Sequence, residues 1–383
     1  MKHLLIVCLL LVCHLLQAQP KLFFNFVSHN EENGQWNNTL FYTANRAKLI
    51  AWTDSLNSRN ATWNMQSDWV YLTNVLSKET VPLMSSTNNK NILRWMHEDK
   101  NVEMDPHAHE SQYLYPDVVK LMDSVGLPES KLIGGTIYND SNGINIWTNL
   151  VNGQYGLIYP TRFWKPDYMM GGGTPNHIND LNYFGCWNPQ SPATYLAHDT
   201  SSRLRHLGTG CTMKLFDSLN VDTFIINLKH ILEMVHNSSN GFYLQTIFFS
   251  QPDLNIPGYT DKLVRVMDSV NSWVNMGWAE WKTLKQSYTW WEQTYAKQMF
   301  QKSCAEVTSV MDDVWKEKEY LVFPNPAHHE LCFRGAEGYS KELYDVMGKL
   351  IMTTKWDVMD VHDIPAGIYF LRCQNKTLKV IIE

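Results

Sequence analysis

Charged residues are scarce in this chain, and neither sign of charge is present in large excess. Asp, Glu, Lys and Arg make up 18% of the 383 residues, and the formal net charge at pH 7 is -6. A net negative charge argues against nucleic acid or an anionic membrane as the main partner. Hydrophobic residues make up 44%, which excludes a disordered chain and predicts a globular one. A chain of this length accommodates one large domain and one small domain.

Closely spaced cysteines are also absent. Two of the seven cysteines lie within residues 1–19, and no two of the other five stand at the spacing of a zinc ligand pair. Cys186 with Cys211 is the disulfide to test first, and small buried hydrophobic side chains are the equal alternative. The run GGGT at residues 171–174 lacks the lysine of a phosphate-binding loop, which disfavours nucleotide binding.

The long apolar run of the chain lies at its start, in MKHLLIVCLLLVCHLLQAQ. A charged start, an apolar centre and small residues at the end are typical of a secretory signal peptide, here with cleavage near Ala18 or Gln19. The run is too short to span a bilayer, and no later segment is apolar enough to do so. We therefore expect residues 1–19 to be a signal peptide and the mature protein to be exported without a membrane span.

The last part of the chain consists of short β-rich runs separated by turn residues, after the charged segment MDDVWKEKEY. This spacing predicts a small all-β sandwich. FPNPA (323–327), LYDVMGK (343–349) and IPAGIYFLR (364–372) resemble, in order and spacing, the C-terminal sorting domain of the type IX secretion system. The resemblance covers residues 319–383. It implies a Gram-negative bacterium, contact with the type IX secretion machinery, and release or attachment at the cell surface. An ordinary ligand-binding β module is the alternative.

Residues 20–300 alternate strand-like and helix-like runs, and we expect residues 301–318 to be a linker to the tail. KLFFNFVSHNEEN begins with an apolar strand, TANRAKLIAWTDSLNS has apolar residues at helical spacing, and TWNMQSDWVYL is a second strand candidate. VEM is a short strand that ends at DPHAHES. Such repeats predict a parallel α/β sheet or barrel, with its active site at the carboxyl ends of the strands. SHNEE and DPHAHE both fall there.

The order of these units over residues 21–290 resembles the polysaccharide deacetylase-like family of metal-dependent carbohydrate esterases. The resemblance implies a distorted (β/α) barrel, a divalent metal ion, and hydrolysis of acyl groups on glycans. An acidic motif closes the first strand in that family, and HNEE stands there instead of two aspartates. His107 and His109 are closer together than the two histidines of the family. Ser250 and Gln251 replace the histidine after the last strand.

The two sequence clusters predict a metal site. His107 and His109 project to the same side of an extended segment and can reach one ion, and imidazole favours zinc. The alternative is that both cap the following turn. His29 and Glu31 would point one way after the first strand and Glu32 the other. We expect His29 and Glu31 to complete the metal shell and Glu32 to take a proton from metal-activated water. A solvated acidic turn is the alternative for Glu32.

Two further carboxylates flank the histidine pair. Asp105 stands before it and Glu110 directly behind it, and a carboxylate in either place could orient a ligating imidazole through its other nitrogen. Because Asp105 precedes Pro106, it could equally form a turn. Glu110 could equally be a surface charge. Both alternatives stay open at this point.

Residues 159–211 are rich in Gly, Pro, Trp and Tyr, as loops that shape substrate binding over a barrel mouth often are. Exposed aromatic rings stack on the C–H faces of sugars. We therefore expect Arg162, Trp164 and Trp187 to contact a glycan, and the two tryptophans to matter more for binding than for stability. Packing within the loop is the alternative role.

Three functions fit these patterns. The first is a secreted metal-dependent hydrolase, a carbohydrate deacetylase or esterase that uses a metal-activated water. The second is a glycan-binding protein on the same fold, which the altered motifs leave non-catalytic. The third is another metallohydrolase class with a His-x-His motif, but that motif normally closes the first strand. Here a strand, a helix and a further strand precede DPHAHES. Bound metal separates the first function from the second.

Overall fold

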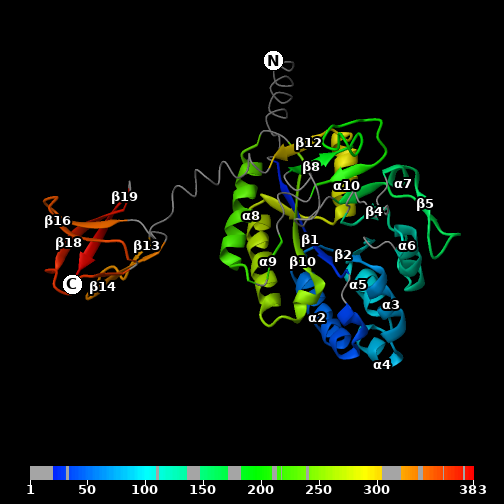
Figure 1. The fold of residues 1–383 in the computed structure, drawn as a ribbon, viewed down its shortest axis with the longest axis horizontal. Helices are drawn as coiled ribbons and strands as arrows, with labels where there is room; N and C mark the ends of the chain where they lie inside the picture. The colour runs from blue at the N-terminus through cyan, green and yellow to red at the C-terminus, as the bar shows by residue number, and fades with distance from the viewer. Residues whose placement is uncertain are drawn as a thin grey trace, which may run out of the picture. The chain divides into compact units, whose positions relative to one another are not determined.

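The structure of the protein is a computed structural model. It describes residues 20–31, 34–108, 112–135, 147–170, 183–208, 214–216, 218–238, 241–303, 321–334, 340–356, 358–373 and 376–383. The chain divides into two compact units, Met1–Val307 and Thr308–Glu383 (Figure 1). The predicted signal peptide lies outside the described residues. Within them, no helix combines the length and the apolar character needed to span a bilayer.

A parallel sheet of five strands forms the centre of the larger unit. Its strands are β1 (Leu22–His29), β2 (Trp63–Ser67), β3 (Glu103–Pro106), β10 (Tyr243–Ser250) and β11 (Ala279–Trp281). The order is β10-β1-β2-β3, and β11 pairs with the amino half of β1, while β2 pairs with its carboxyl half. Every residue of β1 is buried, because both faces of a parallel sheet are covered.

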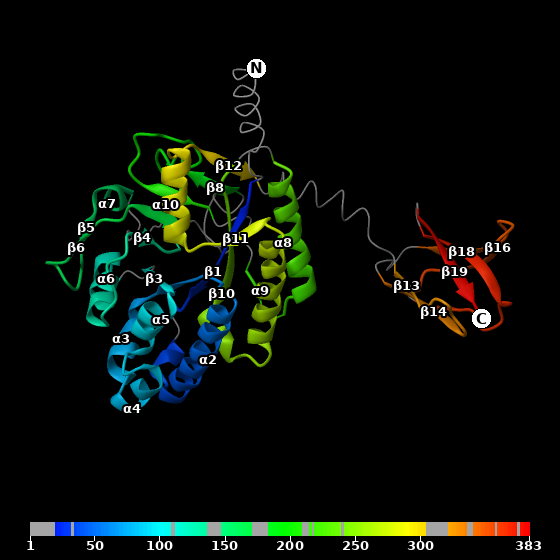
Figure 2. The same cartoon turned by 180° about the vertical axis from the view of Figure 1, so that it is seen from behind.

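Helices cover one face of this sheet (Figure 1, Figure 2). Phe24 packs against Trp273 and Phe26 against Trp52, from two of these helices. Several of the helices begin where a side chain accepts hydrogen bonds from free backbone N–H groups. Asn38 does so before α2, Asp68 before α3 and Asn91 before α5. The described α-helices of this unit are α2 (Thr39–Ser58), α3 (Trp69–Lys78), α4 (Val81–Met84), α5 (Ile92–Lys100), α6 (Tyr115–Ser124), α7 (Trp147–Asn152), α8 (Val221–His236), α9 (Tyr259–Asn275) and α10 (Leu284–Tyr295).

The predicted strand TWNMQSDWVYL is only partly right. β2 ends at Ser67, and the carboxylate of Asp68 accepts a hydrogen bond from the backbone N–H of Tyr71, 2.8 Å away. This cap starts α3 at Trp69, so the second half of the predicted strand is helical.

A second sheet faces the other side of β1 and β10. Its order is β12-β8-β9-β7-β4. One isolated bridge joins His107, after β3, to Gly134, after β4. A second joins Lys214 to Phe248 in β10. Val27, Leu132 and Phe248 share one apolar cluster, so the two sheets enclose a common core. The larger unit is therefore mixed α/β. Its remaining strands are β4 (Leu132–Ile133), β5 (Gln154–Tyr155), β6 (Phe163–Trp164), β7 (Tyr168–Met170), β8 (Tyr183–Trp187), β9 (Arg205–Leu207) and β12 (Phe300–Ser303).

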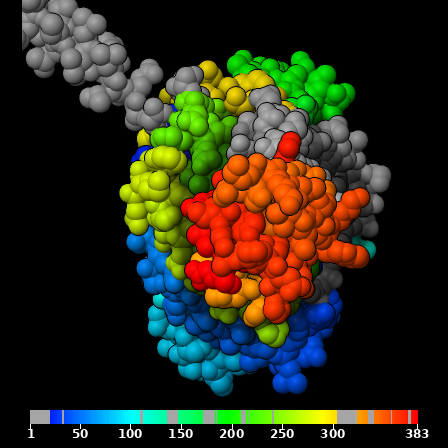
Figure 3. Space-filling model, turned by 90° about the vertical axis from the view of Figure 1, so that its left-hand side faces the viewer, coloured from blue at the N-terminus to red at the C-terminus, as the bar shows by residue number. Residues whose placement is uncertain are grey.

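The smaller unit consists of β-strands in the part of it that the structure describes, and Figure 3 shows its surface in orange and red. One sheet has the order β13-β14-β17 and the other β16-β15-β18-β19. Leu331 and Val361 share a core with Leu343, Leu371 and Val380, as in a sandwich. The strands are β13 (Leu321–Phe323), β14 (Glu330–Arg334), β15 (Lys341–Asp345), β16 (Leu350–Thr354), β17 (Val358–Asp360), β18 (Gly367–Cys373) and β19 (Lys376–Ile382).

Candidate metal centre

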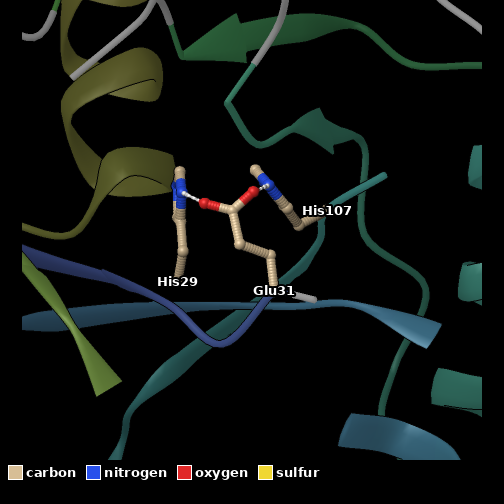
Figure 4. A group of neighbouring side chains, drawn as sticks. All are labelled: His29, Glu31 and His107. Atoms are coloured by element: carbon tan, nitrogen blue, oxygen red, sulfur yellow. Dashed lines mark hydrogen bonds and ion pairs between the residues drawn. The ribbon is translucent and has the colours of Figure 1, made fainter. Parts of the chain in front are cut away.

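Three ligand-type side chains meet at the carboxyl ends of β1 and β3 (Figure 4). His29 is the last residue of β1, Glu31 follows two residues later, and His107 comes directly after β3. One nitrogen of each imidazole and one oxygen of the carboxylate all lie within 4.8 Å of one another. Two imidazoles and a carboxylate are a common ligand set for a divalent metal ion, so these residues could hold one.

Glu31 lies between the two imidazole rings. Its Oε2 is 2.8 Å from Nε2 of His107, and its Oε1 is 3.5 Å from Nδ1 of His29. The ring centroids are 4.1 Å apart. Both imidazoles are buried, whereas the Glu31 side chain is 34% exposed. The cluster is therefore open to solvent on the side of Glu31.

The other nitrogen of each imidazole faces an oxygen that can only accept. Nε2 of His29 lies 2.6 Å from Oε1 of Gln66, and Nδ1 of His107 lies 3.1 Å from the carbonyl oxygen of Gly134. Each of these nitrogens therefore carries a hydrogen, and in a neutral imidazole the nitrogen that faces Glu31 then has the lone pair. Lone pairs directed at a carboxylate are favourable only with a cation between them, either a proton or a metal ion. The donor set fits a metal.

Two glycines bring the backbone after β4 close to the imidazoles. Gly135 has φ +62°, and a Cβ there would overlap the His107 ring and lie 2.9 Å from Cε1 of His29. A Cβ on Gly134 would overlap Oε1 of Gln66. The hydroxyl of Tyr115 donates to the carbonyl oxygen of Gly134 at 2.9 Å, which fixes this segment. A residue with a side chain at position 135 would therefore collide with both imidazole rings.

The structure brings together three of the predicted ligands, His29, Glu31 and His107. Their binding of metal stays a prediction. The other three residues predicted near them, Glu32, His109 and Glu110, lie outside the described residues.

Asp105 lies inside β3 and not in a turn. Its buried carboxylate accepts hydrogen bonds from Nδ2 of Asn64 and from Oγ of Ser130. The turn interpretation is therefore wrong, and Asn64 stands where an imidazole was expected. Burial raises the pKa of Asp105, and burial together with the charge of Asp105 raises the pKa of Glu103.

The two tryptophans predicted to bind sugar are core residues. Trp164 is 1% exposed and donates from Nε1 to the carbonyl oxygen of Ser130 at 2.7 Å. Trp187 is fully buried and donates to the carbonyl oxygen of Tyr195 at 2.9 Å. A sugar cannot stack on a ring without an exposed face, so this prediction does not hold in the structure. Arg162 forms an ion pair with Asp123 in α6, at 3.1 Å.

The hypothesis of a Cys186–Cys211 disulfide also fails. Cys186 in β8 is a buried free thiol, and burial raises its pKa well above the usual range. A neutral buried thiol is unreactive, so Cys186 acts as a small apolar core residue.

A cavity of about 240 Å³ lies at the opposite edge of the strands, where β3, β4 and β7 begin. Glu103, Lys131 and Tyr168 are among its lining residues. Its carboxylates already have partners. Glu103 accepts from the backbone N–H groups of Leu284 and Lys285 at the start of α10. Parallel α/β folds place their active sites at the carboxyl edge instead, so the histidine cluster is the better candidate.

Sequence reasoning missed the two amides beside the cluster, Asn64 and Gln66. They alternate with Trp63 and Met65, a pattern typical of a strand with one face in water. Every residue of β2 is nevertheless buried. The sequence does place two amides, Asn64 and Gln66, on the same face of one strand. A strand between two neighbouring strands of a parallel sheet buries that face, and this combination would have indicated them.

Comparison with known proteins identifies the tail and leaves the larger unit without a family. Residues 321–383 match the family model of the secretion system C-terminal sorting domain. A search of curated proteins finds no match.

Three similar solved structures are distant in sequence and only loosely alike in fold. A 4-alpha-glucanotransferase from Thermococcus litoralis has 9% identity and a TM-score of 0.43, over 71% of this chain and 40% of that one. This chain thus spans well under half of that enzyme. A candidate polysaccharide deacetylase from Mycobacterium smegmatis has 8% identity and a TM-score of 0.40, over 70% of this chain and 95% of that one. A candidate glycoside hydrolase/deacetylase from Parabacteroides distasonis has 9% identity and a TM-score of 0.38, over 95% of this chain and 85% of that one. Similarity this low supports no statement about activity.

The three tail motifs fall within residues 321–383, and the described part of this segment is all β. Residues 321–383 are therefore a C-terminal sorting domain of the type IX secretion system, and the protein is exported to the cell surface or the extracellular space.

Proposed function

We propose that the larger unit is a metal-dependent hydrolase that removes acyl groups from glycans outside the cell. The observation that carries this proposal is the cluster of His29, Glu31 and His107, in which one nitrogen of each imidazole faces an oxygen of the same carboxylate. The resemblance of the unit to polysaccharide deacetylases in its layout motivates the substrate class. It also motivates the proposed fold, a distorted (β/α) barrel of the deacetylase type.

In this proposal His29, Glu31 and His107 hold the ion, with His109 as a further ligand, and two imidazoles favour zinc. A bound divalent ion would supply a water with a pKa lowered to about 7 and would polarise the acyl carbonyl.

The contribution of the chain is to position the substrate and move a proton. We assign the base to Glu32, because Glu31 already lies between the two imidazoles. Glu32 takes the proton of the attacking water as the oxygen of that water bonds to the acyl carbon. The bond from the acyl carbon to the sugar oxygen or nitrogen then breaks, and the proton passes to that atom. The products are the free sugar group and a carboxylic acid.

A second candidate is a glycan-binding protein without catalysis. The end of β10, where the deacetylase family has its last histidine, carries Ser250 and Gln251. The side chain of Gln251 is buried and bonds to Asn30 and Asn45, so it is occupied with structural partners. Among the described residues of the cluster, Glu31 is the single carboxylate.

The test is zinc content and acetate release by the mature chain, residues 20–383, purified without chelators. Acetylated bacterial and plant glycans serve as substrates. The double variant His29→Ala with His107→Ala should lose both bound zinc and acetate release, with circular dichroism to check that it is folded.

The matched control removes two exposed histidines of the sorting domain, His328→Ala with His362→Ala, and should keep both properties. Zinc without acetate release on any glycan would favour the glycan-binding candidate. A wild-type chain that holds no zinc and gains none on addition would contradict the proposal.

A further inference from the structure

A continuous run of hydrogen bonds connects the candidate metal centre to a buried carboxylate in β3. Nε2 of His29 lies 2.6 Å from Oε1 of Gln66, and Nε2 of Gln66 donates to Oδ1 of Asn64 at 2.9 Å. Nδ2 of Asn64 then donates to Oδ2 of Asp105, whose other oxygen accepts from Ser130. All five side chains are buried.

The direction of this run is set at its far end. An amide has a donating end and an accepting end, so two amides in series could point either way. A carboxylate only accepts, so Asn64 must present its NH2 group to Asp105 and its oxygen to Gln66. Gln66 must then present its NH2 group to Asn64. This leaves the oxygen of Gln66 for His29, which has to carry its hydrogen on Nε2.

One neighbour of Gln66 supports the same orientation independently. Sδ of Met170 lies 3.4 Å from Nε2 of Gln66, and a thioether can accept a hydrogen bond but not donate one. The NH2 group of Gln66 therefore has two acceptors beside it, Oδ1 of Asn64 and Sδ of Met170.

We propose that Asp105 is a positioning residue for the metal centre and acts on His29 through Asn64 and Gln66. It fixes the hydrogen of His29 on Nε2 and so keeps the lone pair of Nδ1 directed into the cluster. Partners that fix the tautomer of a ligating histidine strengthen metal binding. The effect on the ion rests on the proposed function, whereas the tautomer of His29 is a property of the metal-free chain.

The direct test is nitrogen NMR of the metal-free mature chain, labelled on histidine, at pH 8. The variant His29→Gln assigns the signal. We expect His29 to carry its hydrogen on Nε2 in the wild type, and Asp105→Leu to give a mixture of tautomers or Nδ1–H. Asp105→Asn should restore Nε2–H, because its oxygen can accept from Asn64 while its NH2 group donates to Ser130.

The second readout is the zinc dissociation constant, measured by competition with a chromophoric chelator. Asp105→Leu should weaken binding about 10-fold to 100-fold, and Asp105→Asn should stay near the wild type. Ser130→Ala is the matched control. It removes a hydrogen bond to Asp105 without interrupting the run, so it should change neither the tautomer nor the zinc affinity. If Asp105→Leu does not fold, Gln66→Met breaks the run with little change in volume and is read in the same way.

An Nδ1–H tautomer in the wild type overturns the proposal, and so does an unchanged tautomer in Asp105→Leu. A changed tautomer with unchanged zinc affinity also overturns it, because the position of the hydrogen would then not matter to the ion. A wild-type chain that binds no zinc contradicts the proposed function but leaves the tautomer measurement intact. The two failures can therefore be told apart.

Discussion

Gly135→Ala should weaken zinc binding as well as the fold, through two separate effects. Gly135 has φ +62°, and placing alanine in this left-handed region costs about 1 kcal/mol. In a unit of this size such a cost lowers the melting temperature by about 2–4 °C. The larger effect is steric. The new Cβ would overlap the His107 ring and lie 2.9 Å from Cε1 of His29, so at least one imidazole must move. Ligand positions in a metal site tolerate shifts of about 0.2 Å, so zinc affinity should fall about 10-fold or more.

A matched control separates backbone strain from the displacement of the rings. Gly258 has φ +76°, and a Cβ there would meet nothing within 4 Å. Gly258→Ala should therefore show the drop in melting temperature that backbone strain alone causes, measured by scanning fluorimetry in EDTA, with unchanged zinc affinity. Equal zinc affinity in Gly135→Ala and Gly258→Ala would refute the placement of the ion beside these rings.

Three further predictions address other parts of the molecule. Trp164→Ala should cost about 3–5 kcal/mol, a drop in melting temperature on the order of 10 °C, because the ring is buried; lost glycan binding at an unchanged melting temperature would show an exposed ring. The pKa of Glu103 is raised to about 8 in the folded chain, so its contribution to stability is full at low pH and is lost as pH rises through that value. Glu103→Gln should therefore show a shallower fall in melting temperature between about pH 5 and pH 8 in EDTA, and parallel curves for both chains would contradict this. A chain without residues 319–383 should stay folded and accumulate in the periplasm, and fractionation that finds it at the surface would contradict the sorting role.

The position of the candidate site could be predicted from the sequence, because parallel strands deliver their carboxyl ends to one edge. SHNEE and DPHAHE each follow a short apolar strand, and that local pattern is enough to place them at this edge. The structure has His29 as the last residue of β1, Glu31 two residues later, and His107 directly after β3. The bridge from His107 to Gly134 adds β4 to the same edge.

The surroundings of the site could not be predicted, because they depend on contacts between residues far apart in the chain. Trp164 lies in a Gly- and Pro-rich stretch that suggested exposure, but its Nε1 finds the carbonyl oxygen of Ser130, 34 residues away. Asn64 and Gln66 alternate with apolar residues, which is typical of a strand with one face in solvent. Their partners, Asp105 and His29, are brought to them by β3 and β1, on either side of β2.

The central claim is that His29, Glu31 and His107 hold a divalent metal ion, and X-ray absorption at the zinc edge of the purified mature chain tests it most directly. The account predicts at least two imidazole nitrogens at about 2.0–2.1 Å together with oxygen ligands. Glu31→Gln should alter the oxygen shell while the imidazole signal remains. A zinc shell with sulfur at about 2.3 Å, or a chain without zinc, would contradict the account.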